Sequence, residues 1–159
     1  MPTSIPVGAS PAAVALIIVI PVVVVAVVLF TTLPLLGARI VITSDTISIK
    51  PSVLGSGISF SRSDVKAMYV ANLSEDRDLQ PTMRLWGASL MGYKYGWFKL
   101  ANGHKAFLAI YGSSDLAVVA VLKDGTYVVM SPKNVEALIN ALKSYGWLES
   151  SELNKSRNP

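Results

Sequence analysis

The chain has 159 residues, and all 24 of its charged side chains (14 Lys and Arg, 10 Asp and Glu) lie between Arg39 and Arg157. The first 38 residues carry no charged side chain, which excludes one uniform globular fold and favours a membrane segment joined to a small soluble domain. The absence of cysteine excludes disulfides, thiolate metal sites and a cysteine nucleophile.

The uncharged segment has the length and composition of a membrane-spanning helix. Ser10 and Pro11 are typical of a helix start, and residues 12–36 are almost entirely aliphatic. As a helix these 25 residues would extend for roughly 37 Å, more than the ~30 Å of a bilayer core. Pro34 and Gly37 are typical of its end. We therefore expect a short tail over residues 1–11 and one transmembrane helix over residues 12–37.

The flanks of this segment predict its role and orientation. A cleaved signal peptide or a pilin-like helix is expected to follow basic residues, and residues 1–8 contain none. Arg39 and Lys50 follow the segment, so the positive-inside rule places the amino terminus outside and the rest of the chain in the cytoplasm. Glycosylation sequons at Asn72 and Asn154 would be usable only with the opposite orientation.

The next segments alternate as strands do. Residues 40–43 and 47–50 flank the turn Ser44-Asp45-Thr46 and predict a hairpin that directs Ile47 and Ile49 into the core. Further strands are expected at residues 58–60, 66–72, 83–86 and 95–100, with a glycine-rich connection at residues 87–92. Asn102-Gly103 and Asp124-Gly125 predict two-residue type I′ hairpin turns. Residues 117–122 are almost continuously apolar, which indicates a central strand buried on both faces.

The period changes after the last strand. Ser131-Pro132 repeats the pattern of a helix start, and apolar residues then recur at helical spacing until Gly146: Val135, Leu138, Ile139 and Leu142. We expect a mainly-β barrel of about seven strands, capped by this amphipathic helix, over residues 38–148. Residues 149–159 are expected to form a flexible polar tail.

Three segments resemble the bacterial and archaeal pleckstrin-homology-like (PH-like) domain family. They are residues 92–100 (GYKYGWFKL), 102–106 (NGHKA) and 127–132 (YVVMSP), followed by the closing helix. The resemblance implies a PH-like barrel with a carboxyl-terminal capping helix, in a family that often carries membrane segments and mostly lacks an assigned activity. Phosphoinositide-binding relatives carry basic residues around the first hairpin loop, which here contains Asp45, so a site of that kind is not expected.

No residue pattern predicts catalysis. His104, Ser113, Ser114 and Asp115 supply the residue types of a hydrolase triad, but the sequence has no nucleophile-elbow motif. The acidic run at residues 75–78 lacks the spacing of a calcium loop, and no phosphate-binding loop is present. We therefore expect a non-enzyme without metal or cofactor.

One charge asymmetry suggests a contact surface. Residues 79–114 contain no acidic side chain, and basic and aromatic residues are interleaved there. The candidate interaction or headgroup face comprises Arg84, Lys94, Lys99, Lys105 and Trp97. Such a face fits a protein partner or anionic lipid better than nucleic acid, and simple strand alternation also produces the pattern. The favoured function is a scaffold or accessory subunit of a membrane complex. The alternatives are a pilin-like or surface-assembly subunit and an anionic-lipid headgroup sensor.

Overall fold

The computed structural model describes residues 19–28, 38–51, 56–112 and 114–148. The chain divides into two compact units, residues 1–33 and 34–159. In the first unit, residues 19–28 are helical, and their valine and isoleucine side chains are 52–62% exposed. No helix within the described ranges has both the length and the apolar character needed to cross a membrane. The expected tail over residues 1–11, most of the expected transmembrane helix over residues 12–37, and the polar tail at 149–159 lie outside the described residues.

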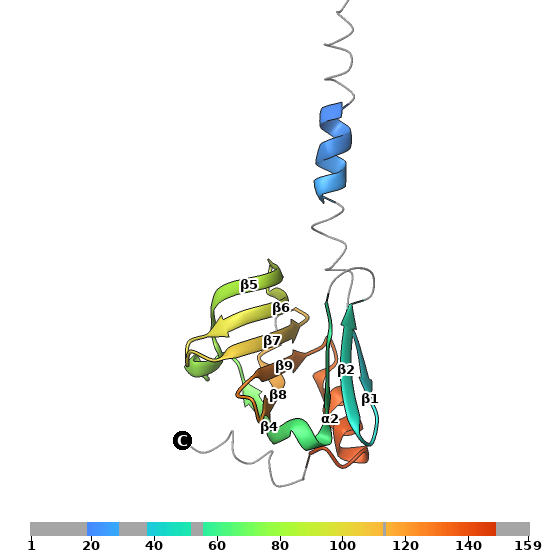
Figure 1. The fold of residues 1–159 in the computed structure, drawn as a ribbon, viewed down its shortest axis with the longest axis vertical. Helices are drawn as coiled ribbons and strands as arrows, with labels where there is room; N and C mark the ends of the chain where they lie inside the picture. Colours follow the sequence, from blue (N-terminus) through green and yellow to red (C-terminus); the bar gives the residue numbers. More distant parts are fainter. Residues whose placement is uncertain (1–18, 29–37, 52–55, 113, 149–159) are drawn as a thin grey trace, which may run out of the picture. The chain divides into compact units, whose positions relative to one another are not determined.

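The described part of the second unit contains nine strands and a carboxyl-terminal helix (Figure 1). The strands are β1 (Ala38–Ile42), β2 (Thr46–Pro51), β3 (Ile58–Ser61), β4 (Val65–Asn72), β5 (Pro81–Leu90), β6 (Tyr93–Leu100), β7 (Lys105–Ile110), β8 (Leu116–Leu122) and β9 (Tyr127–Ser131). The helix is α2 (Val135–Ser144), and two short 3-10 turns are η2 (Arg62–Asp64) and η3 (Arg77–Leu79).

The first three strands form their own antiparallel sheet in the order β1-β2-β3. The predicted first hairpin is confirmed, with Ile42 opposite Ile47 at its turn. Ile47 and Ile49 are fully buried, as the alternation predicted. On the other side of β2, the hydroxyls of Ser48 and Ser59 are hydrogen-bonded at 2.8 Å.

The other six strands form a second sheet in the order β4-β8-β9-β7-β6-β5. The β8–β9 hairpin lies between β4 and β7, so β9 runs parallel to β7 while its other neighbour, β8, is antiparallel. Strand β8 is buried on both faces, as predicted from its sequence. The expected barrel of about seven strands is thus corrected to nine strands in two sheets, because β1–β3 pair only with one another among the described residues.

The glycine-rich segment at residues 87–92 is mostly strand rather than connection. Strand β5 continues to Leu90 because Gly87 and Gly96 face each other across the β5–β6 pair. Their φ angles are +119° and +124°, and a Cβ on Gly96 would lie 2.4 Å from the carbonyl oxygen of Trp86. Only glycine fits such a close approach of two backbones, so these residues permit the strand instead of ending it.

The two predicted type I′ turns have another geometry. In each, glycine has a positive φ, at Gly103 and Gly125, but the preceding Asn102 and Asp124 do not. The Leu100 amide donates to the His104 carbonyl at 2.9 Å, which closes a three-residue loop. A type I′ turn needs positive φ at both central residues, whereas a three-residue hairpin loop needs it only at its last residue.

Helix α2 begins later than predicted. Its N-cap is Asn134, whose side chain accepts a hydrogen bond from the Ala137 amide at 3.0 Å. Ser131 instead ends β9, where it is buried and donates to the Leu116 carbonyl at 2.7 Å. The predicted apolar stripe is confirmed, since its four members are buried. Gly146, with φ +71°, ends the helix in a Schellman motif, because the Trp147 amide reaches the Leu142 carbonyl at 2.8 Å.

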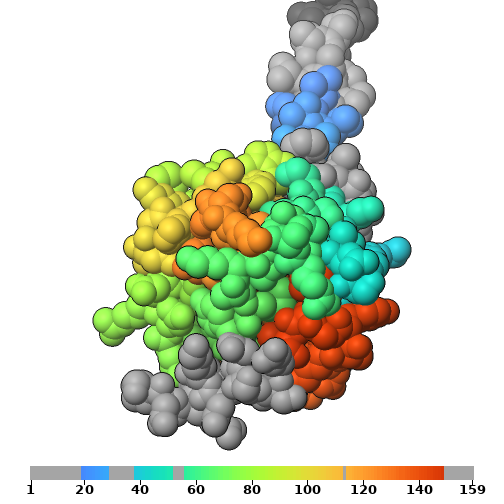
Figure 2. Space-filling model, turned by 60° about the horizontal axis from the view of Figure 1, so that its bottom comes forward, coloured from blue at the N-terminus to red at the C-terminus, as the bar shows by residue number. Residues whose placement is uncertain are grey.

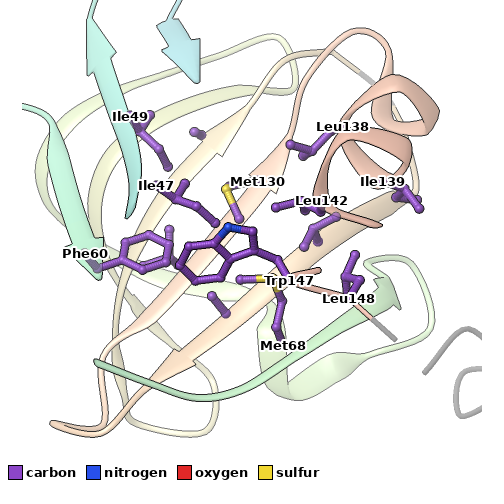
Figure 3. Close-up of a cluster of buried hydrophobic side chains, with 14 of the residues drawn as sticks. Ile47, Ile49, Phe60, Met68, Met130, Leu138, Ile139, Leu142, Trp147 and Leu148 are labelled. Carbon is purple, nitrogen blue, oxygen red and sulfur yellow. The ribbon is translucent and has the colours of Figure 1, made fainter. Parts of the chain in front are cut away.

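The main apolar core lies between the first sheet, the second sheet and α2. Trp147 occupies its centre in Figure 3, beside Phe60, Met68 and Met130. Its ring meets Phe60 edge-on at 6.4 Å, and its indole N–H donates to the Thr43 carbonyl at 2.7 Å. Figure 2 shows α2 (red) beside the first sheet (cyan) on one face of the domain. The helix therefore closes the space between the two sheets.

Candidate interaction surface

The clearest exposed apolar surface is strand β5, which is an edge strand of the second sheet. Met83, Leu85, Trp86 and Leu90 are each about half exposed. The pairing register of β5 with β6 shifts twice, between Pro81 and Met83 and between Arg84 and Trp86. Bulges of this kind re-aim side chains and protect a sheet edge from pairing with another chain. Contact through these side chains is therefore favoured over strand addition.

The β5–β6 turn carries the most exposed apolar side chain on the described surface. Leu90 pairs with Tyr93, which leaves Met91 and Gly92 as a two-residue turn with φ +46° and +84°. These positive angles make it a type I′ turn, where asparagine, aspartate or glycine is usual. Met91 is 95% exposed. Sequence reasoning placed this turn within a longer connection at residues 87–92, and Gly92 was the available signal for it.

Two members of the predicted interaction face are in direct contact. The Lys105 ammonium lies 4.2 Å from the centroid of the Trp97 ring, and this ring meets Phe107 edge-on at 5.2 Å. Lys99 is directly opposite Lys105 in the β6–β7 pairing. Opposed residues of an antiparallel pair share a face. Trp97, Lys99 and Lys105 therefore belong to one side of the second sheet.

The other two members lie on the opposite side of that sheet. Arg84 is paired with Phe98, and Lys94 is paired with Ser89. Phe98 belongs to the second apolar cluster, on the reverse side from Trp97. The five predicted residues are therefore divided by the sheet, because a strand sends successive side chains to alternate faces.

A pocket of about 320 Å³ lies beside the same hairpin. It is lined mostly by apolar atoms and three tyrosine rings, and the lining residues are Ala38, Ile40, Tyr93, Tyr95, Ala109, Ile110, Tyr111, Pro132, Lys133 and Asn134. The Tyr93 and Tyr111 rings meet edge-on at 5.1 Å. Burial raises the pKa of Tyr95 to about 12, and its hydroxyl donates to the Ser56 carbonyl at 3.3 Å. This volume is at the lower end of the range for small-molecule pockets.

The first hairpin loop is occupied by contacts within the domain. Thr43 Oγ1 accepts from the Thr46 amide at 3.0 Å, and Arg62 donates to the Ser44 carbonyl through Nε and Nη2 at 3.0 and 2.9 Å. The loop carries Asp45 and no basic residue of its own. It thus presents no cluster of cations for an inositol phosphate.

Among the residues that could supply a hydrolase triad, His104 lies far from the others that the structure describes. His104 precedes β7, whereas Ser114 and Asp115 follow it, so roughly 20 Å of extended strand separates them. His104 is exposed, and its ring lies against Tyr127 at 5.2 Å. Ser113 lies outside the described residues. Within the described ranges, no three His, Asp or Glu side chains lie together as a metal site would require.

Comparison with known proteins places this fold. A family profile described as "Bacterial PH domain" matches residues 38–145. The chain belongs to the bacterial PH domain family. The two sheets with a carboxyl-terminal helix fit a PH-like fold, as the sequence resemblance predicted. Neither a curated protein nor a solved structure matches the chain. PH-like domains are generally interaction domains rather than catalytic ones, and this agrees with an exposed apolar strand as the most prominent surface feature.

Proposed function

We propose that this chain is a single-span membrane protein that presents its PH-like domain at the cytoplasmic membrane surface. The domain acts there as a non-enzymatic interaction module, as a scaffold or an accessory subunit of a membrane complex. Its contact surface for a partner is the exposed part of β5 around Met83, Leu85 and Trp86.

The observation that carries this proposal is the helix at residues 19–28. Its side chains are all apolar, and the valines and isoleucine among them are more than half exposed. Leaving one such side chain in water instead of an apolar environment costs about 1.5–3 kcal/mol. A helix that is apolar on all sides is typical of a membrane span or a protein interior. The apolar sequence continues on both sides of it, over residues 12–36.

The orientation rests on the basic residues after this segment. Arg39 and Lys50 are exposed and directly opposite each other in the β1–β2 pair. Basic residues close to a span favour its cytoplasmic side, and residues 1–11 contain none.

Alkaline extraction of membranes that contain the full chain tests the anchor. We expect the protein to stay in the membrane pellet. The double substitution Val23→Lys and Val27→Lys should release it, because each lysine at the centre of a span costs about 2.5–3.5 kcal/mol. Val41→Lys is the matched control, because it makes the same change at an exposed position of β1. Release of the unsubstituted chain would contradict the proposal.

A further inference from the structure

At one end of the PH-like domain, its first strand begins close to the β5–β6 turn. Ala38, the first residue of β1, lines the same pocket as Tyr93, Tyr111 and Lys133. A Cβ on Gly92 would lie 3.3 Å from the carbonyl oxygen of Gly112, so the turn also lies next to the segment after β7. We call this the proximal end of the domain, because the chain enters the domain there.

The proximal end projects apolar side chains. Met91, at the turn, is 95% exposed, and the preceding Leu90 is about half exposed. Met91 also has a left-handed backbone, with φ +46°, which a long side chain rarely adopts. Residues kept in such conformations tend to lie at functional sites. A stable turn alone would favour asparagine at this position.

Basic side chains also belong to this end of the domain. Lys94 follows it in β6, Lys133 lies at the pocket, and Arg39 and Lys50 oppose each other beside Ala38. Like charges placed directly opposite each other destabilise a strand pair, and anionic groups beside the pair would offset this repulsion. The nearest acidic residues along the chain are Asp115, four residues after Tyr111, and Glu136, three residues after Lys133.

We propose that the β5–β6 turn inserts Met91 and Leu90 into the interface of an anionic bilayer, so that the proximal end of the domain lies on the membrane. Arg39, Lys50, Lys94 and Lys133 then face lipid phosphates, and Tyr93 and Tyr111 lie at headgroup depth. This inference rests on the proposed membrane anchor and adds a second, peripheral attachment to it.

The position of Ala38, where the chain enters the domain, favours lipid over a protein partner. With an anchor before Ala38, the bilayer begins a few residues from the proximal end, so the turn reaches lipid without a long linker. The combination of exposed apolar side chains, tyrosines and basic residues is the one found where proteins meet a membrane interface. Phosphate recognition here is by charge alone and needs no specific headgroup.

The absence of cysteine from the chain permits a direct test. The full chain carrying Met91→Cys is labelled with an environment-sensitive fluorophore and inserted into vesicles of phosphatidylcholine and phosphatidylglycerol. Ala101→Cys is the matched control, because Ala101 is exposed at the other end of β6, roughly 26 Å away. Leu90→Cys provides a second site within the proximal end.

We expect the label at positions 91 and 90 to be quenched by nitroxide-bearing lipid and largely protected from aqueous iodide, with the reverse at position 101. If iodide quenches position 91 as strongly as position 101 while the chain resists alkaline extraction, the inserted turn is wrong and the anchor stands. Failure of the chain to remain in the vesicles overturns both. If the label at position 91 is protected from iodide in native membranes but not in vesicles, the turn contacts a protein partner and the proposed lipid contact is wrong.

Discussion

The guanidinium of Arg62 lies 4.5 Å from the centroid of the Trp147 ring and joins three parts of the domain. Its Nη1 donates to the Gly146 carbonyl at 2.8 Å and its Nη2 to the Tyr145 carbonyl at 2.7 Å, directly after α2. The same side chain binds the Ser44 carbonyl in the first hairpin. A positive charge at the carboxyl end of a helix is favourable. Arg62 thus links the end of α2 to the first hairpin, beside the main core.

Substitution of this arginine should reduce stability. We expect Arg62→Ala to lower the free energy of unfolding by about 2–3 kcal/mol, since several carbonyls lose a charged donor. Arg62→Lys should recover little, because lysine lacks the planar fork that reaches separate carbonyls. Arg77→Ala, at an exposed position of η3, should change the value by less than about 0.5 kcal/mol. Urea unfolding of the full chain in detergent, followed by tryptophan fluorescence, measures all three. Equal effects of Arg62→Ala and Arg77→Ala would refute this role.

The close approach of β5 and β6 predicts a second difference. Gly96→Ala should cost about 3–5 kcal/mol, because its Cβ would meet the Trp86 carbonyl oxygen and its φ is +124°. Gly103→Ala also has a positive φ, but nothing lies within 4 Å of its Cβ, so we expect a cost of about 1 kcal/mol. Thermal unfolding of the two variants separates the close contact from the backbone angle. Similar melting temperatures would show that the two strands do not approach as described.

The turn residue Met91 should be unfavourable for stability. We expect Met91→Asn to raise the free energy of unfolding by up to about 1 kcal/mol, because asparagine tolerates the left-handed conformation better. Met83→Asn, at an exposed position of β5 without a positive φ, should give no gain. Urea midpoints of the two variants provide the comparison. A loss of stability in Met91→Asn would indicate that the methionine side chain supports the fold.

The buried Tyr95 and the half-buried Tyr69 predict a loss of stability at high pH. Burial raises the pKa of Tyr95 and of Tyr69 from 10 to about 12. The unfolded chain therefore releases these protons first, so their contribution is complete below pH 10 and is lost as the pH rises through 12. Tyr95→Phe should weaken this dependence, and Tyr145→Phe, at an exposed position, serves as its control. Unfolding midpoints measured across this range would contradict the assignment if Tyr95→Phe left the slope unchanged.

Much of the domain could be predicted from the sequence because local patterns specify it. Alternation directed Ile47 and Ile49 into the core, and the spacing from Val135 to Leu142 marked the buried side of α2. These features depend on residues close in the chain. The start of α2 was misplaced because Ser131 has a partner in β8, the Leu116 carbonyl, which local capping patterns do not reveal.

The candidate surface could not be predicted in the same way. The predicted basic face counted residues along the chain, but strand pairing places Lys99 and Lys105 on one side of the sheet and Arg84 and Lys94 on the other. The extent of β5 depends on the close approach of Gly87 and Gly96, whereas sequence reasoning treated residues 87–92 as a connection. Register and close backbone contacts are properties of the pairing and not of one strand.

The side of the membrane on which the PH-like domain lies is measured most directly with a membrane-impermeant thiol reagent. The full chain is expressed with Lys123→Cys, an exposed position in the β8–β9 turn and its only cysteine. We predict a membrane-bound protein that is labelled only after the cells are permeabilised, as a domain on the cytoplasmic surface requires. Labelling in intact cells, or recovery of the protein in the soluble fraction, would contradict the account.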